Sequence, residues 1–132
     1  MFKRIVNPFL TFGLLLSTAG IALAAAYTSS GLLHDTNTID YVPFSAPQSS
    51  VISYTATGSG SGSNECEVKL QQQDSGGAWH TLDSEVLQMP FDVDTGSATV
   101  LNYLSGTTEL LRWRLSRKAL TKSVTWEVDW SY

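Results

Sequence analysis

The chain has 132 residues, with 12 acidic and eight basic side chains and a formal net charge of −4 at pH 7. An acidic chain is a poor general binder of nucleic acid, so we expect no nucleic-acid partner. Cys66 is the single cysteine, which excludes an intrachain disulfide and leaves stability to the apolar core.

The N-terminus has the layout of a secretory signal peptide. The basic pair Lys3 and Arg4 precedes an uncharged apolar run, and small residues occupy the two positions that signal peptidase reads before a cut after Ala24. A cut after Ala26 is the alternative. We therefore predict an exported protein that is secreted, periplasmic or on the cell surface.

The same segment could instead stay attached as a membrane anchor over residues 5–26, since its uncharged run approaches the roughly 20 residues of a spanning helix. We expect the membrane to be a partner only if this segment is not cleaved. The predicted organisation is a signal peptide or anchor over 1–24, a flexible segment leading into the domain over 25–35, and one domain over 36–132.

After residue 30 the sequence has the period-two alternation of strands and no sustained helical period. Glycine, serine, aspartate and proline separate the runs. The fold class predicted is all-β: one antiparallel two-sheet sandwich of about eight strands, immunoglobulin-like or jelly-roll, preceded by an N-terminal hydrophobic helix. The predicted strands are 36–44, 49–57, 65–72, 78–83, 84–90, 97–103, 109–117 and 122–130.

One hairpin is indicated in the middle of the chain. Cys66, Val68 and Leu70 share one strand face, and the glycine-rich run 73–77 supplies the turn. Because Cys66 belongs to this apolar face, we expect a buried thiol.

Asp92 and Asp94 precede Gly96 in an Asp-x-Asp-x-Gly cluster. Two carboxylates in a tight turn could hold a hard cation such as Ca²⁺, although the full EF-hand pattern is missing. Aspartate and glycine also dominate ordinary turns. Calcium at this pair is therefore a candidate, and no other cofactor is expected.

A last hairpin is predicted from two strands with one apolar face each. Pairing 109–117 with 122–130 would place Trp113 opposite Trp126 and Arg112 opposite Glu127. Trp79, Trp113 and Trp126 are assigned to the core.

The tip of that hairpin is basic, and Arg117, Lys118 and Lys122 are the candidate binding residues there. With Arg112 and Arg114 behind them, they could meet an anionic polysaccharide, a lipid headgroup or an acidic subunit. The alternative is that these charges only keep the edge soluble, with Glu127 and Asp129 neutralising the two arginines.

Catalytic residues are not indicated, and we predict that the protein is not an enzyme. His34 and His80 are the two histidines, and neither accompanies a nucleophile motif. Carboxylate pairs two residues apart, Asp83 with Glu85 and Glu65 with Glu67, also arise on any solvated strand face.

The stretch 65–130 resembles small β-sandwich modules of phage virion and bacterial surface proteins. The features shared are the turn 74–77 followed by Trp79 and Leu82, and the Arg-Trp-Arg strand at 112–114. The resemblance implies a β-sandwich with a structural or adhesive role, and it assigns no functional residue.

Two classes of function follow. The first is a non-catalytic domain that acts by surface contact, as a subunit of an envelope, filament or virion assembly or as an adhesion module, with self-association or a surface or polysaccharide as partner. The second is a carbohydrate-binding module, with or without Ca²⁺. A small secreted hydrolase is a distant third.

Overall fold

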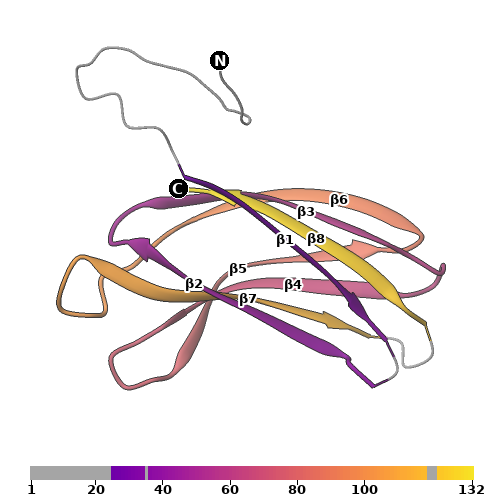
Figure 1. Ribbon diagram of the computed structural model, residues 1–132, viewed down its shortest axis with the longest axis horizontal. Helices are drawn as coiled ribbons and strands as arrows, with labels where there is room; N and C mark the ends of the chain where they lie inside the picture. The colour runs from indigo at the N-terminus through magenta and orange to yellow at the C-terminus, as the bar shows by residue number, and fades with distance from the viewer. Residues whose placement is uncertain (1–24, 35, 119–121) are drawn as a thin grey trace, which may run out of the picture.

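The computed structural model describes residues 25–34, 36–118 and 122–132, in which the extended structure is built from eight β-strands (Figure 1). The strands are β1 (Ala26–Leu33), β2 (Ile39–Pro47), β3 (Val51–Gly60), β4 (Glu65–Gln73), β5 (Trp79–Gln88), β6 (Phe91–Thr99), β7 (Thr108–Arg117) and β8 (Val124–Ser131). They form two antiparallel sheets of four, which confirms the predicted all-β class.

The two sheets have the strand orders β1-β8-β3-β6, called here the β8 sheet, and β2-β7-β4-β5, called the β7 sheet. The pairing is nested: β4 pairs with β5, β3 with β6, β2 with β7 and β1 with β8. The chain thus forms a long hairpin whose turn lies between β4 and β5, and each arm alternates between the sheets.

The central hairpin is confirmed, with β4 and β5 joined through the predicted turn and Cys66 fully buried. Between Leu70 and Gln71 the register shifts, so one strand over 79–88 replaces the two predicted over 78–83 and 84–90. A bulge of this kind interrupts the alternation without ending the strand.

β1 corrects the prediction of a flexible segment over 25–35, because the sandwich begins at Ala26. The strand lacks apolar alternation since Gly31 stands on its inner face. A Cβ there would lie 2.7 Å from the Trp126 ring, so the indole fills the space of the missing side chain. β6 likewise runs over 91–99 and not over the predicted 97–103.

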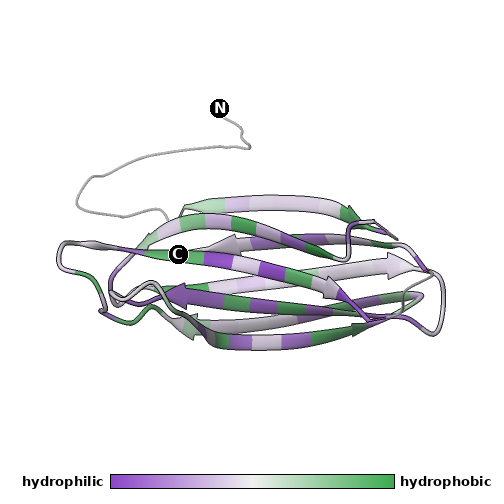
Figure 2. Ribbon diagram, turned by 90° about the horizontal axis from the view of Figure 1, so that it is seen from below, coloured by the Kyte–Doolittle hydropathy of each residue, from purple (hydrophilic) through white to green (hydrophobic). Residues whose placement is uncertain are grey.

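The predicted last hairpin is wrong, because β7 and β8 lie in different sheets. Each strand has one apolar face, as expected, but the two faces belong to different sheets and meet across the core. Figure 2 shows hydrophilic and hydrophobic residues following one another along the strands of the two layers. Trp113 of β7 and Trp130 of β8 meet edge to face at 5.7 Å between ring centroids. Alternation of apolar and polar residues predicts which face of a strand is buried, but it does not predict which strand lies beside it.

Aromatic rings fill the centre of the core around Trp113, which is 0% exposed. Tyr54 contacts it edge-on at 4.8 Å, and Phe44 lies against it at 6.2 Å. The prediction that Trp79 belongs to this core is wrong, because the ring lies on the outer face of the β7 sheet, where Arg112 covers it at 4.1 Å. Trp126 is buried as predicted.

A buried carboxylate organises the segment between β6 and β7. Glu109 is 0% exposed and accepts hydrogen bonds from the side chains of Gln48 at 2.6 Å and Gln72 at 3.0 Å. The backbone N–H groups of Tyr103 and Leu104 also donate to it. Burial opposes ionisation, but these donors outweigh it and hold the pKa of Glu109 below its usual value.

Residues 1–24 lie outside the described part of the chain, and with them the predicted signal peptide and N-terminal helix. Within the described ranges no helix is long and apolar enough to cross a membrane.

The positions of the tryptophans predict unequal effects of truncation. Trp113→Ala should lower the free energy of unfolding by about 3–5 kcal/mol, because it leaves a large cavity between the sheets. Trp79→Ala should cost no more than about 1–2 kcal/mol, because it removes only a surface ring contact. Urea unfolding of both variants tests this, and equal losses would contradict the placement of Trp79.

Glu109 should make stability depend on acid. Its pKa is lower in the folded than in the unfolded chain, so its contribution is complete above the ordinary carboxyl pKa of about 4.3 and is lost as the pH falls through the folded-state pKa. Glu109→Gln should destabilise the protein at pH 7, and the gap to wild type should shrink toward pH 3. A gap in urea-unfolding free energy that stays constant with pH would disprove the assignment.

Candidate binding faces

The predicted calcium pair does not form a tight turn. Asp92 and Asp94 both lie in β6, and the carboxylate of Asp92 accepts the backbone N–H groups of Gln88 and Val93, each at 2.9 Å. Both of its oxygens are therefore engaged in holding the β5–β6 turn. No group of three or more His, Cys, Asp or Glu side chains placed for a metal ion occurs among the residues described.

The predicted basic tip is not a single surface. Arg117 is only 6% exposed, and its guanidinium donates to the carbonyl oxygens of His34 at 3.3 Å and Lys122 at 3.0 Å. It therefore fastens the ends of three strands to one another. Lys118 and Lys122 are exposed, and Lys118 lies 3.8 Å from a carboxylate oxygen of Glu65.

The histidines have local structural contacts. His80 bonds to Asp74 at 2.6 Å, and the same carboxylate accepts the backbone N–H groups of Gly76 and Ala78. The His80 bond, followed by the Ala78 N–H, holds the pKa of Asp74 below its usual value. This group shapes the β4–β5 turn, and His34 contacts Thr36 beside it in the chain.

The pair Asp83 and Glu85 lies where the edge strands β5 and β6 meet. The Tyr54 hydroxyl donates to Asp83 at 2.8 Å and approaches Glu85 at 3.5 Å. Burial, then the charges of Asp83 and Asp94, raise the pKa of Glu85. Gly96 makes this contact feasible, because a Cβ there would lie 2.5 Å from the tyrosine oxygen.

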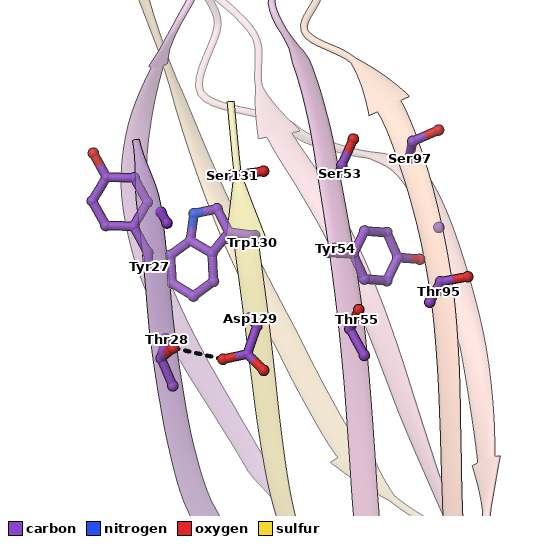
Figure 3. Close-up of a pocket in the computed structure, with 12 residues that line it drawn as sticks. Tyr27, Thr28, Ser53, Tyr54, Thr55, Thr95, Ser97, Asp129, Trp130 and Ser131 are labelled. Atoms are coloured by element: carbon purple, nitrogen blue, oxygen red, sulfur yellow. Dashed lines mark hydrogen bonds between the residues drawn. The ribbon is translucent and has the colours of Figure 1, made fainter. Parts of the chain in front are cut away.

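The outer face of the β8 sheet carries an array of hydroxyl groups, called here the hydroxyl face. Strand register aligns Thr28, Asp129, Thr55 and Thr95 in one row across the four strands. The next row contains Ser131, Ser53 and Ser97. Figure 3 shows these side chains side by side on β1, β8, β3 and β6.

The two rows line an open hollow of about 680 Å³. Thr28 donates a hydrogen bond to Asp129 at 2.5 Å, which fixes the carboxylate among the hydroxyls. Each hydroxyl can donate one hydrogen bond and accept others. The hollow therefore offers a ligand many neutral polar contacts and one negative charge.

The outer face of the β7 sheet has different chemistry. Arg112 lies between two rings, 4.3 Å from the centroid of Tyr41 and 4.1 Å from that of Trp79. Its Nε donates to the side-chain oxygen of Gln71 at 2.9 Å. Arg114 lies on the same side of β7, and we call this surface the arginine face.

The sequence carried the signal for the hydroxyl face, because serine and threonine alternate through 53–59 and 95–99. The face forms only because the strands lie in the order β1-β8-β3-β6, and the alternation of residues along each strand does not predict that order. The sequence likewise contains Trp79 and Tyr41 but does not predict that both contact Arg112. That contact depends on the pairing of β2 with β7, β4 with β5 and β4 with β7.

The sequence matches no known protein family and no curated protein. Among solved structures, the chain is similar to the Yersinia pseudotuberculosis-derived mitogen, with a TM-score of 0.50, 10% identity, and coverage of 82% of this chain and 86% of the mitogen. PirA aligns with a TM-score of 0.49 and 14% identity, covering 86% of this chain and 100% of PirA. The mitogen likeness concerns the fold alone, that of a small β-protein.

The engagement of Asp92 predicts that calcium has no effect on stability. Adding millimolar CaCl₂ or EDTA should leave the melting temperature unchanged, because the carboxylate oxygens already accept backbone hydrogen bonds. Differential scanning calorimetry measures this. A calcium-dependent rise that Asp92→Asn abolishes would restore the metal site.

Proposed function

We propose that this protein is an exported, non-catalytic adhesion module that binds carbohydrate through its hydroxyl face. The observation that carries the proposal is the hollow across four strands, lined by serine and threonine hydroxyls around Asp129. Sugars present hydroxyl groups that both donate and accept, as these side chains do. Single hydrogen bonds of this kind contribute about 1 kcal/mol, so an array is needed.

The strand order supports this reading of the fold. We infer that the nested pairing of β1 with β8 through β4 with β5 is a jelly roll, the second of the two sandwich types considered from sequence. Jelly rolls include lectin and viral capsid domains. Because a fold hosts many functions, the hollow carries the proposal and the fold only agrees with it.

The backbone hydrogen bonds of Ala25 bear on the choice of cleavage position. Ala25 and Tyr132 exchange two backbone hydrogen bonds, of 3.0 and 3.2 Å, which extend the β1–β8 pairing. A cut after Ala24 would keep these bonds, whereas a cut after Ala26 would remove them and the first residue of β1. We therefore keep Ala24 as the proposed cleavage position, with the protein secreted, periplasmic or on the cell surface.

The second candidate is a structural subunit that assembles through the edge of β1. β2, also an edge strand, contains Pro43 and Pro47, and the edge strands β5 and β6 carry carboxylates. β1 has neither proline nor charge. Such an edge is open to pairing with another strand, which favours self-association.

The hydroxyl face can be tested with two matched substitutions on β3. Thr55→Trp should fill the hollow and abolish binding to neutral glycans, because the ring would cover neighbouring hydroxyls. Thr57→Trp makes the same change two residues along the same face, outside the lining residues, and should bind as wild type does. A glycan array followed by calorimetry on the best ligand measures both.

Circular dichroism and melting temperature would first establish that both variants fold. Glycan binding by Thr55→Trp at wild-type affinity would remove the hydroxyl face from the proposal. The absence of any glycan ligand for the wild-type protein would remove the function itself.

A further inference from the structure

The guanidinium of Arg112 is held in one position on the arginine face. Its Cζ lies over the ring of Tyr41 from β2 and over the ring of Trp79 from β5, and Gln71 from β4 accepts its Nε hydrogen. A guanidinium stacked on aromatic rings is favoured by its planarity and weak hydration. Neighbours on three other strands thus orient the group before any ligand arrives.

Arg112 is partly exposed, and within the described ranges its terminal nitrogens form no hydrogen bond. Within the described part of the chain, no carboxylate forms an ion pair with it. The expectation that Glu127 and Asp129 neutralise this arginine is wrong, because both lie on the outer face of the β8 sheet. The charge of Arg112 is therefore available on this surface.

Arg114 extends the positive surface along β7. Two residues on the same side of a strand are about 6.6–6.8 Å apart, and Arg114 also lacks an ion-pair partner among the residues described. Lys69 lies opposite Arg114 on β4, and its Nζ forms an ion pair with a carboxylate oxygen of Glu67 at 3.9 Å. The face therefore presents two arginines next to each other along one strand.

We propose that the arginine face binds an acidic polysaccharide through its sugar carboxylates, as a site separate from the hydroxyl face. The fork of Arg112 can donate two parallel hydrogen bonds to one carboxylate, with Arg114 reaching the next. Tyr41 and Leu110, 50% and 45% exposed, add apolar surface on the same side for the sugar rings.

The net charge of the chain bears on how an acidic polysaccharide could bind. At −4 it repels polyanions at long range, so binding must come from short-range, oriented contacts and not from general attraction. The affinity should then depend on the geometry of the guanidinium as well as on its charge.

The test is calorimetric titration of the full chain with polygalacturonate, with uncharged dextran as the reference polymer. Wild type should bind polygalacturonate. Any binding of dextran would belong to the hydroxyl face, so Arg112→Gln should leave it unchanged. Arg112→Gln and Arg114→Gln should each weaken binding about tenfold or more, the usual loss for a charge-assisted hydrogen-bonded pair. Arg112→Lys, which keeps the charge but loses the fork, should weaken it as well.

Two control variants show whether the loss of affinity belongs to the arginine face. Lys122→Gln removes one charge from the basic tip, the other surface considered for an anionic polysaccharide, and leaves the arginine face intact. Unchanged affinity in this variant is the result expected if the arginine face is the site. Thr55→Trp should also bind polygalacturonate normally, so that failure of the hydroxyl face and failure of the arginine face are distinguishable. If Arg112 variants melt early because they lose the ring contacts, Arg114→Gln still decides the matter.

Several results would overturn the proposal. These are no polygalacturonate binding by wild type, equal weakening by Lys122→Gln, or full affinity in the Arg112→Gln and Arg114→Gln variants. Binding to vesicles of anionic phospholipid, lost in the same variants while polygalacturonate is ignored, would assign the face to a membrane instead.

Discussion

The packing of Trp113 against Trp130 between the sheets is the contact on which the rest of the molecule depends. β7 and β8 are central strands of different sheets, so this contact fixes the distance and orientation of the two layers. Because side chains alternate along a strand, burying Trp113 also directs Arg112 and Arg114 outward. Burying Trp130 does the same for Asp129. Both proposed binding faces are therefore consequences of one buried aromatic contact.

The hydroxyl face and the arginine face carry different kinds of polar side chain. The β8 sheet presents neutral hydroxyls with Asp129 among them, and the β7 sheet presents arginine between aromatic rings. The sandwich keeps these surfaces on opposite sides, where the core separates their charges. The buried Glu109 belongs to neither, since its hydrogen bonds serve to hold the preceding segment against the sheet edge. Acidic residues thus have different roles according to burial and partners.

Alternation in the sequence is sufficient to predict an all-β domain, the buried Cys66 and the central hairpin, because these depend on local pattern and turn chemistry. It cannot supply long-range pairing, so it joins β7 and β8 as neighbours although they face each other across the core. It misses β1 because Gly31 accommodates the Trp126 ring in place of a side chain. The predicted site residue Arg117 is buried, since charge alone does not reveal carbonyl partners.

The adjacency of Ala25 and Tyr132 has a mechanical consequence. The two residues pair at one end of antiparallel strands, so a pull applied between them would load the β1–β8 hydrogen bonds one after another, starting at this pair (Figure 1). Such unzipping needs little force, whereas pulling strands past each other would strain many bonds at once. A domain held by both ends would open at β1 first and leave β3, β6 and the β7 sheet paired.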